Sequence, residues 1–372
     1  MENVIRNQLK EKDSELERLR DELTKAREEV RKLQQQVTTR QDNKYLDTKD
    51  LHHFSSSCQQ LYSSLKIWCN QFSSFSIGKK CVHVHRLKDE AVRDRVEHVM
   101  LDDRGVRRML KDDNKRSEVF MAITIRMIWE HVFTRYLFGL EVDERKKLIS
   151  LETTLAEVGL HEAVHQWRST TLTLLSTRPA IIAKRDADTE EIVQTIFNLL
   201  NFLLPPPPQY RSLAMESLRS LVQHSVQLAV EMRTQRAEYV MKRPPRPDYD
   251  DQGEVINTVP FVASSMQNRG PEPISAQELE EEGATVKLIL FPQVIRRGNE
   301  YGENYETETT VLPMQVLVNR PQLSPMETPK TTPEKAKVAA QSILPVIPEQ
   351  TIRLVQEDAA ASRGYPFPNI ED

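Results

Sequence analysis

The chain has 372 residues and carries 51 Lys and Arg against 55 Asp and Glu, a net charge of −4 with neutral histidines, which excludes the strongly basic surface typical of nucleic-acid-binding proteins. Of its ten glycines only Gly78, Gly105, Gly139 and Gly159 precede residue 250, so this part of the chain has neither the G-x-G-x-x-G turn nor the G-x-x-x-x-G-K-[ST] loop of the two common nucleotide-binding classes. Three cysteines without a C-x-x-C pair favour a reducing compartment over a disulfide framework.

The N-terminus lacks the apolar core of a signal peptide. The most apolar stretch, residues 119–140, includes Arg126, Glu130, His131 and Arg135, whereas a membrane span needs about 20 largely uncharged residues. We therefore expect a soluble protein, cytoplasmic or nuclear, that binds neither membranes nor nucleic acid.

Residues 1–40 have the heptad pattern of a coiled coil. One apolar series recurs every seven residues and a second falls four before or three after it, so nine of the ten seam positions are apolar and Lys12 is the exception. The seam residues that we expect to drive oligomerisation are Ile5, Leu9, Leu16, Leu19, Leu23, Val30, Leu33 and Val37.

Charges beside this seam have the spacing of a parallel dimer. Glu15 to Arg20 and Glu22 to Arg27 match the g-to-e′ ion pairs between two parallel chains. A single solvated helix is one alternative, although it would leave the leucine stripe in water. Another is that residues 1–40 are the end of a longer coiled coil that extends upstream of Met1.

Residues 50–242 are expected to form an all-helical domain. Helical spacing of apolar residues, caps and breakers predict helices over 51–72, 86–105, 118–140, 143–159, 160–176, 190–204 and 210–241. The helix at 118–140 is apolar nearly all round and should be central and buried. Asp188 or Thr189 is the expected cap of the helix that four prolines, residues 205–208, bring to an end.

Beyond Lys242 the composition changes. Prolines and polar residues predict a linker over 243–283. Two apolar runs, 286–291 and 310–318, flank a polar segment and predict a long-looped β-hairpin within 284–319. Because a two-stranded ribbon is marginally stable alone, we expect it to dock on the helical domain.

Residues 320–372 are rich in proline, threonine and charge, and are predicted to be a disordered tail. Ser324, Thr328 and Thr332 each precede a proline and are candidate phosphorylation sites, each of which would add about −1.5 to −2 charge. The alternative is a proline-rich tail that only solvates the protein.

Two segments carry a resemblance. Leu-Phe-Pro-Gln-Val-Ile-Arg-Arg-Gly from Leu290 to Gly298, followed by Pro-Met-Gln-Val-Leu-Val from Pro313, resembles a group of uncharacterised coiled-coil proteins of filamentous fungi. The resemblance extends over residues 60–320. It implies an architecture and a lineage, and it carries no activity, cofactor or catalytic residue.

One motif could carry chemistry. His161-Glu162-Ala163-Val164-His165 is an H-E-x-x-H sequence, in which two imidazoles on one helix face can bind Zn²⁺ while the glutamate activates a bound water. Glu190 or Glu191 is the candidate third ligand. However, about 2% of chains of this composition contain the motif by chance, and both histidines lie beside an apolar stripe where boundary histidines are common.

A second group, Cys81, His83 and His85, would share one side of a strand. It lacks a fourth ligand, and we expect an ordinary extended connector. His52 and His53 are consecutive and on a helix point about 100° apart, so they cannot chelate together.

These patterns predict a mainly α protein with an N-terminal parallel coiled coil, an all-helical domain, a small β-hairpin and a disordered C-terminal tail. The predicted function is that of a non-enzymatic intracellular scaffold or adaptor, which forms a homo-oligomer, as a parallel dimer, and binds unidentified protein partners through its helical domain. It needs no metal or other cofactor. The alternative is a zinc-dependent hydrolase built on His161, Glu162 and His165.

Overall fold

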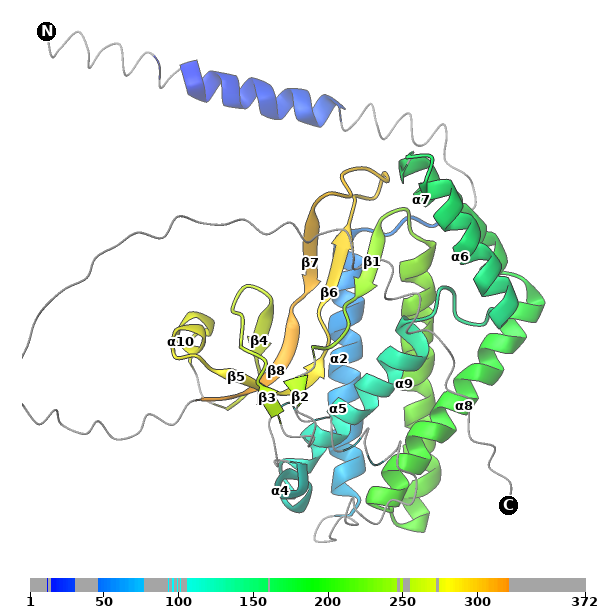
Figure 1. The fold of residues 1–372 in the computed structure, drawn as a ribbon, viewed down its shortest axis with the longest axis vertical. Coiled ribbons are helices and arrows are strands. Elements are labelled where there is room, and N and C mark those ends of the chain that lie inside the picture. The colour runs from blue at the N-terminus through cyan, green and yellow to red at the C-terminus, as the bar shows by residue number, and fades with distance from the viewer. Residues whose placement is uncertain are drawn as a thin grey trace, which may run out of the picture. The chain divides into compact units, whose positions relative to one another are not determined.

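The computed structural model of the chain describes residues 12, 15–30, 46–76, 93, 96, 99, 101, 106–159, 161–245, 248–249, 255–271 and 274–320. The chain divides into a unit of residues 1–322 and a unit of residues 323–372, and all the described residues belong to the first unit (Figure 1). Several predictions concern residues outside this description: most of the helix at 86–105, the Cys81–His85 group, the tail with Ser324, Thr328 and Thr332, and the seam residues Ile5, Leu9, Leu33 and Val37.

The described fold is mainly helical, as the sequence predicts, and it has small sheets where the sequence predicts a single β-hairpin. Residue 12 and residues 15–30 are helical. The other helices are α2 (Leu51–Ser74), α4 (Val106–Lys111), α5 (Arg116–Ile128), the π-helix η2 (Trp129–Phe133), α6 (Val142–Ala156), α7 (His161–Ser176), α8 (Pro179–Leu203), α9 (Pro208–Thr234) and α10 (Ala276–Glu281).

Local sequence explains where several of these helices begin. The Asp50 carboxylate accepts a hydrogen bond from the backbone N–H of His53 at the start of α2, which satisfies one of the free donors of the first turn. Helices α8 and α9 each start on a proline, a residue that suits the first helical position because its missing N–H would have no partner there.

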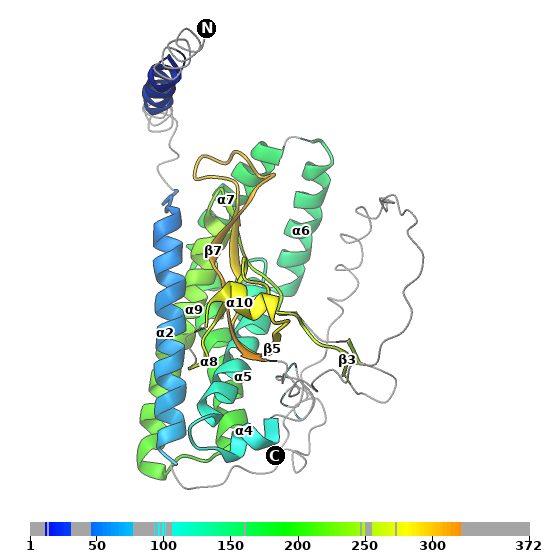
Figure 2. The same cartoon turned by 90° about the vertical axis from the view of Figure 1, so that its left-hand side faces the viewer.

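Helix α5 is the centre of the helical layer. Ten of its thirteen residues are buried, and α2 and α8 pack against it. The Phe72 ring of α2 meets the rings of Phe120 on α5 and Phe197 on α8 edge-on. The Trp68 indole N–H donates to the Ala214 carbonyl 3.0 Å away, which fixes α2 against α9; Figure 2 shows α2 running along the side of this layer.

The strands form two three-stranded sheets and one separate pair. The strands are β1 (Glu238–Met241), β2 (Asp248–Tyr249), β3 (Val255–Asn257), β4 (Met266–Asn268), β5 (Thr285–Phe291), β6 (Val294–Arg297), β7 (Glu308–Leu312) and β8 (Met314–Asn319). Their orders are β1-β6-β7 and β4-β8-β5, with β2 paired to β3. All pairs are antiparallel except β4 with β8.

One bent hairpin connects the two larger sheets. The ribbon β5–β6 pairs with the ribbon β7–β8, with Leu288 opposite Leu317 and Val294 opposite Leu312. The ribbons break beside Pro292 and at Pro313, where a residue without an N–H interrupts the ladder. Phe291 lies in the same apolar core as α2 and α5, so the hairpin residues pack directly on the helices.

Three helix boundaries differ from the prediction. The helix expected over 118–140 ends at Phe133, and the chain then turns at Gly139, whose φ is +93° and whose missing Cβ would lie 2.8 Å from the Ile181 carbonyl. The helix expected from 190 with a cap at Asp188 or Thr189 begins at Pro179. Asp188 instead forms an ion pair, one turn apart on that helix, with Lys184.

The third difference is the helix expected over 210–241, which ends at Thr234 and gives way to the strand β1. A strand can form there because β6, more than 50 residues further on, supplies its hydrogen-bonding partner, with Val240 opposite Ile295. The domain predicted to be all-helical over 50–242 thus ends in a strand.

The linker predicted over 243–283 is folded in part. Val259, Phe261, Met266 and Leu279 are buried in a small second core with residues of β5 and β8. Helix α10 starts in a capping box, in which Ser275 and Glu278 each satisfy a backbone N–H of the other. The sequence prediction missed these few apolar residues because the residues around them are polar. Each becomes buried only when the hairpin packs against it.

Candidate functional site

The N-terminal helix carries an apolar stripe whose described side chains are half exposed. Four of the predicted seam residues are described, and their side chains are about half exposed: Leu16 52%, Leu19 51%, Leu23 51% and Val30 52%. They recur at helical spacing and therefore lie along one side of the helix. We predict that a second helix covers them.

Charged residues lie beside this stripe. Lys12 forms an ion pair with Glu15 at 2.7 Å, and Arg18 forms one with Glu22 at 3.4 Å, both within the helix and exposed. Exposed pairs of this kind each contribute only a few tenths of a kcal/mol. They support the helix without competing strongly with contacts to another chain.

The H-E-x-x-H motif forms the first turns of α7. His161 and Glu162 are exposed and His165 is partly buried. The His165 ring stacks on the Tyr305 ring, with centroids 3.9 Å apart and planes 20° apart. The Tyr305 hydroxyl in turn donates to the Arg236 carbonyl at 2.9 Å, so the histidine anchors the loop between β6 and β7 on α7.

Burial explains the protonation states of the stacked His165 and Tyr305 rings. Desolvation by burial and, to a smaller extent, the charge of Arg168 lower the pKa of His165 to about 4, while Glu238 opposes the shift. Burial also raises the pKa of Tyr305 to about 12. Both rings are therefore neutral at pH 7, which suits a stacked and partly desolvated pair.

The predicted third ligand is engaged elsewhere. Both Glu190 carboxylate oxygens accept hydrogen bonds from the Arg219 guanidinium, at 2.7 and 3.0 Å, and Gln194 donates at 2.8 Å. These bonds lower the pKa of Glu190 and join α8 to α9. Among the described residues no group of three or more His, Cys, Asp and Glu side chains could hold a metal ion, so the set His161, His165 and Glu190 is not brought together.

A buried arginine behind the motif was missed by the sequence analysis. Arg168 is 3% exposed, donates to the carbonyls of Gln235 and Arg236 at 3.3 and 3.2 Å, and lies 3.8 Å from Glu152. These bonds hold α7 on the segment that leads into β1. Nothing local in the sequence marks this role, because the partners lie almost 70 residues away.

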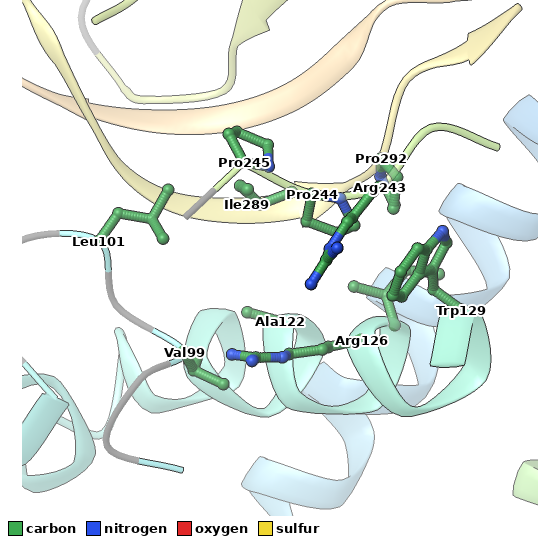
Figure 3. A pocket seen from close by; sticks show the side chains of 11 residues that line it. Val99, Leu101, Ala122, Arg126, Trp129, Arg243, Pro244, Pro245, Ile289 and Pro292 are labelled. Carbon is green, nitrogen blue, oxygen red and sulfur yellow. The ribbon is translucent and has the colours of Figure 1, made fainter. Parts of the chain in front are cut away.

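A hollow lies between α5, the chain after β1, and the bend between β5 and β6. Arg126 and Trp129 line it from the helix, and Arg243, Pro244 and Pro292 from the opposite side (Figure 3). Its cavity volume is about 40 Å³, room for a few water molecules. Pockets that enclose small molecules are several times larger, so this hollow favours neither a substrate nor an organic cofactor.

The described cysteines are unsuited to catalysis. Cys58 and Cys69 are free and buried, and burial raises the pKa of Cys58 to about 12. Since the thiolate is the reactive form, a buried thiol of this kind is inert at neutral pH. Across the described helices, none combines the length and the apolar character needed to cross a bilayer.

Comparison with known proteins identifies a fungal relative. The chain is 40% identical over 329 residues, 87% of its length, to Leashin of Aspergillus fumigatus, and the match covers 6% of that protein. The chain thus has a fungal relative, as the resemblance at Leu290–Gly298 implies, and spans a small part of that relative's length. No family model matches the chain, and no solved structure matches it.

Proposed function

We propose that this chain is a non-enzymatic scaffold that pairs in parallel through residues 4–40 and binds partner proteins through its helical body. The observation that carries the proposal is the half-exposed stripe of Leu16, Leu19, Leu23 and Val30. Leucines at coiled-coil spacing on an otherwise charged helix are stabilised when a second helix covers them.

The free energy of burying the apolar stripe favours two paired helices over a single helix in water. Burying a leucine or valine side chain completely contributes about 1.5–3 kcal/mol, so covering the exposed half of each seam residue contributes roughly half of that. A solitary helix of this length is marginal in water even with good helix formers. A partner helix therefore stabilises both the stripe and the helix that carries it.

The charges beside the seam favour the parallel arrangement. With Leu16 and Leu23 at position a, Glu15 and Glu22 occupy position g, and Arg20 and Arg27 occupy position e. Parallel chains then place each glutamate opposite an arginine of the other chain. Antiparallel chains would place glutamate opposite glutamate and arginine opposite arginine, which is repulsive.

The helical body supports binding better than catalysis. The described hollow has room only for a few waters, the H-E-x-x-H histidine His165 stacks on Tyr305, and the carboxylate of Glu190 is occupied by Arg219. His165 and Glu190 thus each have a structural role. Zinc content of protein purified without chelator tests this directly: about one zinc per chain, lost in His165→Ala, would replace the scaffold with the hydrolase.

The decisive experiment is the mass of the full chain in solution by light scattering. We expect twice the chain mass of 43.1 kDa for the wild type and a single chain mass for Leu16→Glu with Leu23→Glu, because charges in the seam have no partner there. The matched control is Ser14→Glu with Thr24→Glu, which adds the same charge at positions f and b, outside the seam. A wild-type monomer, or a double seam variant of unchanged mass, would refute self-association.

A further inference from the structure

Two arginine side chains face the hollow between α5 and the bend of the hairpin. Arg126 comes from α5, and Arg243 comes from the chain just after β1. In Figure 3 the Arg126 guanidinium lies along the helix side of the hollow, and the Arg243 guanidinium projects toward that helix from the opposite side. Two positive charges from separate parts of the fold therefore line one small space.

The rest of this lining is apolar. The other described residues around the hollow are aliphatic, aromatic or proline, among them Leu101, Trp129 and Pro292, and none of them is acidic. Two like charges repel more strongly beside apolar walls than in water. An anion that enters between the two guanidiniums is therefore stabilised by both of them.

The backbone on each side of the hollow is held in place before any ligand binds. Arg126 belongs to α5, in which ten of thirteen residues are buried. Next to Arg243, the Lys242 backbone N–H donates to the Gln293 carbonyl at 2.8 Å, which fixes the chain after β1 to the bend of the hairpin. A site whose parts are already positioned loses less entropy when it binds.

The size of the hollow selects a small group. Its volume of about 40 Å³ has room for a few water molecules, so only the end of a larger ligand can enter. A phosphoryl group fits this space, because its terminal oxygens can replace those waters. Each planar guanidinium can donate two parallel N–H bonds to such a group.

We propose that this hollow binds the phosphoryl group of a phosphorylated side chain on a partner protein, between Arg126 and Arg243. The inference rests on the proposed function, because it gives the chemistry by which the helical body recognises a partner. A phosphorylated side chain carries about −1.5 to −2 charge at pH 7, which balances two guanidiniums. A single carboxylate would leave one positive charge in excess.

The rim of the hollow favours a phosphoryl group carried by a protein over a free phosphate ion. Trp129, Pro244 and Pro245 line the hollow and are partly exposed. The residues on either side of a phosphorylated side chain can cover these apolar groups, and removing apolar surface from water is favourable. A free phosphate ion covers none of this surface.

The chemistry is tested by calorimetric titration of the full chain with inorganic phosphate. We expect one phosphate bound per chain, and at least ten-fold weaker binding, about 1.4 kcal/mol, for Arg126→Gln and for Arg243→Gln. Arg243→Lys, which keeps the charge and loses the planar fork, should bind with intermediate affinity. Acetate, with a single negative charge, should bind to the wild type at least ten-fold more weakly than phosphate.

The matched control is Arg108→Gln, which removes an exposed arginine from α4 and should bind phosphate as the wild type does. Thermal unfolding of each variant verifies its fold. Arg243 is exposed, so its replacement keeps the test valid even if Arg126→Gln, on the central helix, fails to fold.

The source of the phosphoryl group is tested with the peptide Ala-Leu-phosphoserine-Leu-Ala. We expect this peptide to bind at least ten-fold more tightly than inorganic phosphate, to compete with it, and to lose binding in Arg243→Gln. The same peptide with an unmodified serine should not bind. A phosphopeptide that binds no more tightly than inorganic phosphate would overturn the partner protein as the source.

Three results would overturn the site itself: no phosphate binding by the full chain, binding that Arg126→Gln and Arg243→Gln leave unchanged, or acetate binding as tight as that of phosphate. Repeating the titration with Leu16→Glu and Leu23→Glu separates this site from self-association. Unchanged phosphate affinity in that variant supports the hollow whatever the oligomeric state, whereas a wild-type dimer that binds no phosphate refutes the hollow alone.

Discussion

Arg116 shows how a single buried charge joins two helices. It is 1% exposed, and its guanidinium donates to the Ser73 hydroxyl at 2.9 Å and to the Ser76 carbonyl at 3.1 Å. Asp113 completes the site with an ion pair at 2.8 Å. The guanidinium also donates to the Ser73 carbonyl at 3.3 Å, so the first residue of α5 supplies a donor to the last turn of α2, where carbonyls lack partners further along the helix.

We predict that Arg116→Met lowers the free energy of unfolding by about 2–4 kcal/mol, because it leaves buried acceptors without a donor. Urea denaturation measures this change. Arg108→Met, at an exposed position of α4, is the matched control and should change stability by less than about 0.5 kcal/mol. Equal effects of the two substitutions would show that the Arg116 bonds contribute nothing.

His165 predicts a dependence of stability on pH. Its pKa in the folded protein is about 4, below the value of about 6.5 for an unperturbed histidine, so below pH 6.5 the unfolded state binds more protons than the folded state. Stability from this group is therefore fully present above pH 6.5 and is lost as the pH falls toward 4.

We expect the wild type to lose about 1–2 kcal/mol more than His165→Phe between pH 7 and pH 5. Phenylalanine keeps a flat ring against Tyr305 and does not titrate. Chemical denaturation at the two pH values gives the difference, and His161→Gln, at an exposed position, should behave as the wild type. Parallel losses in the wild type and His165→Phe would mean that His165 does not sense pH.

At the scale of elements, contacts with distant parts of the chain decide where a helix ends. The apolar pattern of α5 continues past Ile128, but the chain widens into the π-helix η2 and then turns. Within η2 the Trp129 indole N–H donates to the Met241 carbonyl at 3.1 Å. The end of β1 therefore fixes the Trp129 side chain at the point where the α-helix becomes a π-helix. Residues 129 and 241 meet only in the folded protein.

The parallel orientation that we propose for the N-terminal helices can be tested with a cysteine. In a parallel, in-register pair the two copies of residue 16 face each other at position a, within reach of a disulfide. We predict that Leu16→Cys with Cys81→Ser forms a covalent dimer on mild oxidation, seen by non-reducing electrophoresis. Arg18→Cys in the same background, at an outer position, should not. Equal cross-linking of both would rule out the parallel register.

On the scale of the whole molecule, pairing would make the chain bivalent. Two helical bodies joined through residues 4–40 can engage two partner domains at once, and the second contact is then intramolecular. Avidity gains from such linkage reach about 10²–10⁴ when the geometry allows both contacts. A scaffold with weak individual contacts can thus hold a dense array of partners.

We predict at least about ten-fold slower dissociation of the wild type than of Leu16→Glu with Leu23→Glu from a surface densely coated with a single-domain antibody fragment raised against the helical body. At low surface density the two proteins should dissociate at the same rate, because only one domain is then within reach. Biosensor measurements at both densities check this. Identical rates at high density would contradict bivalent binding.

The sequence by itself determined features that depend on near neighbours along the chain. The start of α2, the pairing of the two ribbons around the loop at 298–307, and the exposed leucine series at 16, 19 and 23 follow from periodicity, caps and turn residues. Charge and glycine content excluded nucleotide loops and basic surfaces for the same reason, since those signals are local.

Only the tertiary structure decided the features that depend on distant residues. The strand β1 forms because β6 pairs with it, and the segment 259–279 folds because β5 and β8 cover its apolar side chains. The pKa of His165 is lowered because the ring is buried, stacked on Tyr305, and lies near the charge of Arg168. In each case the partner lies far along the chain or on another element. Burial and hydrogen bonding arise between residues that meet in space, and a pattern read along the sequence records only one side of each contact.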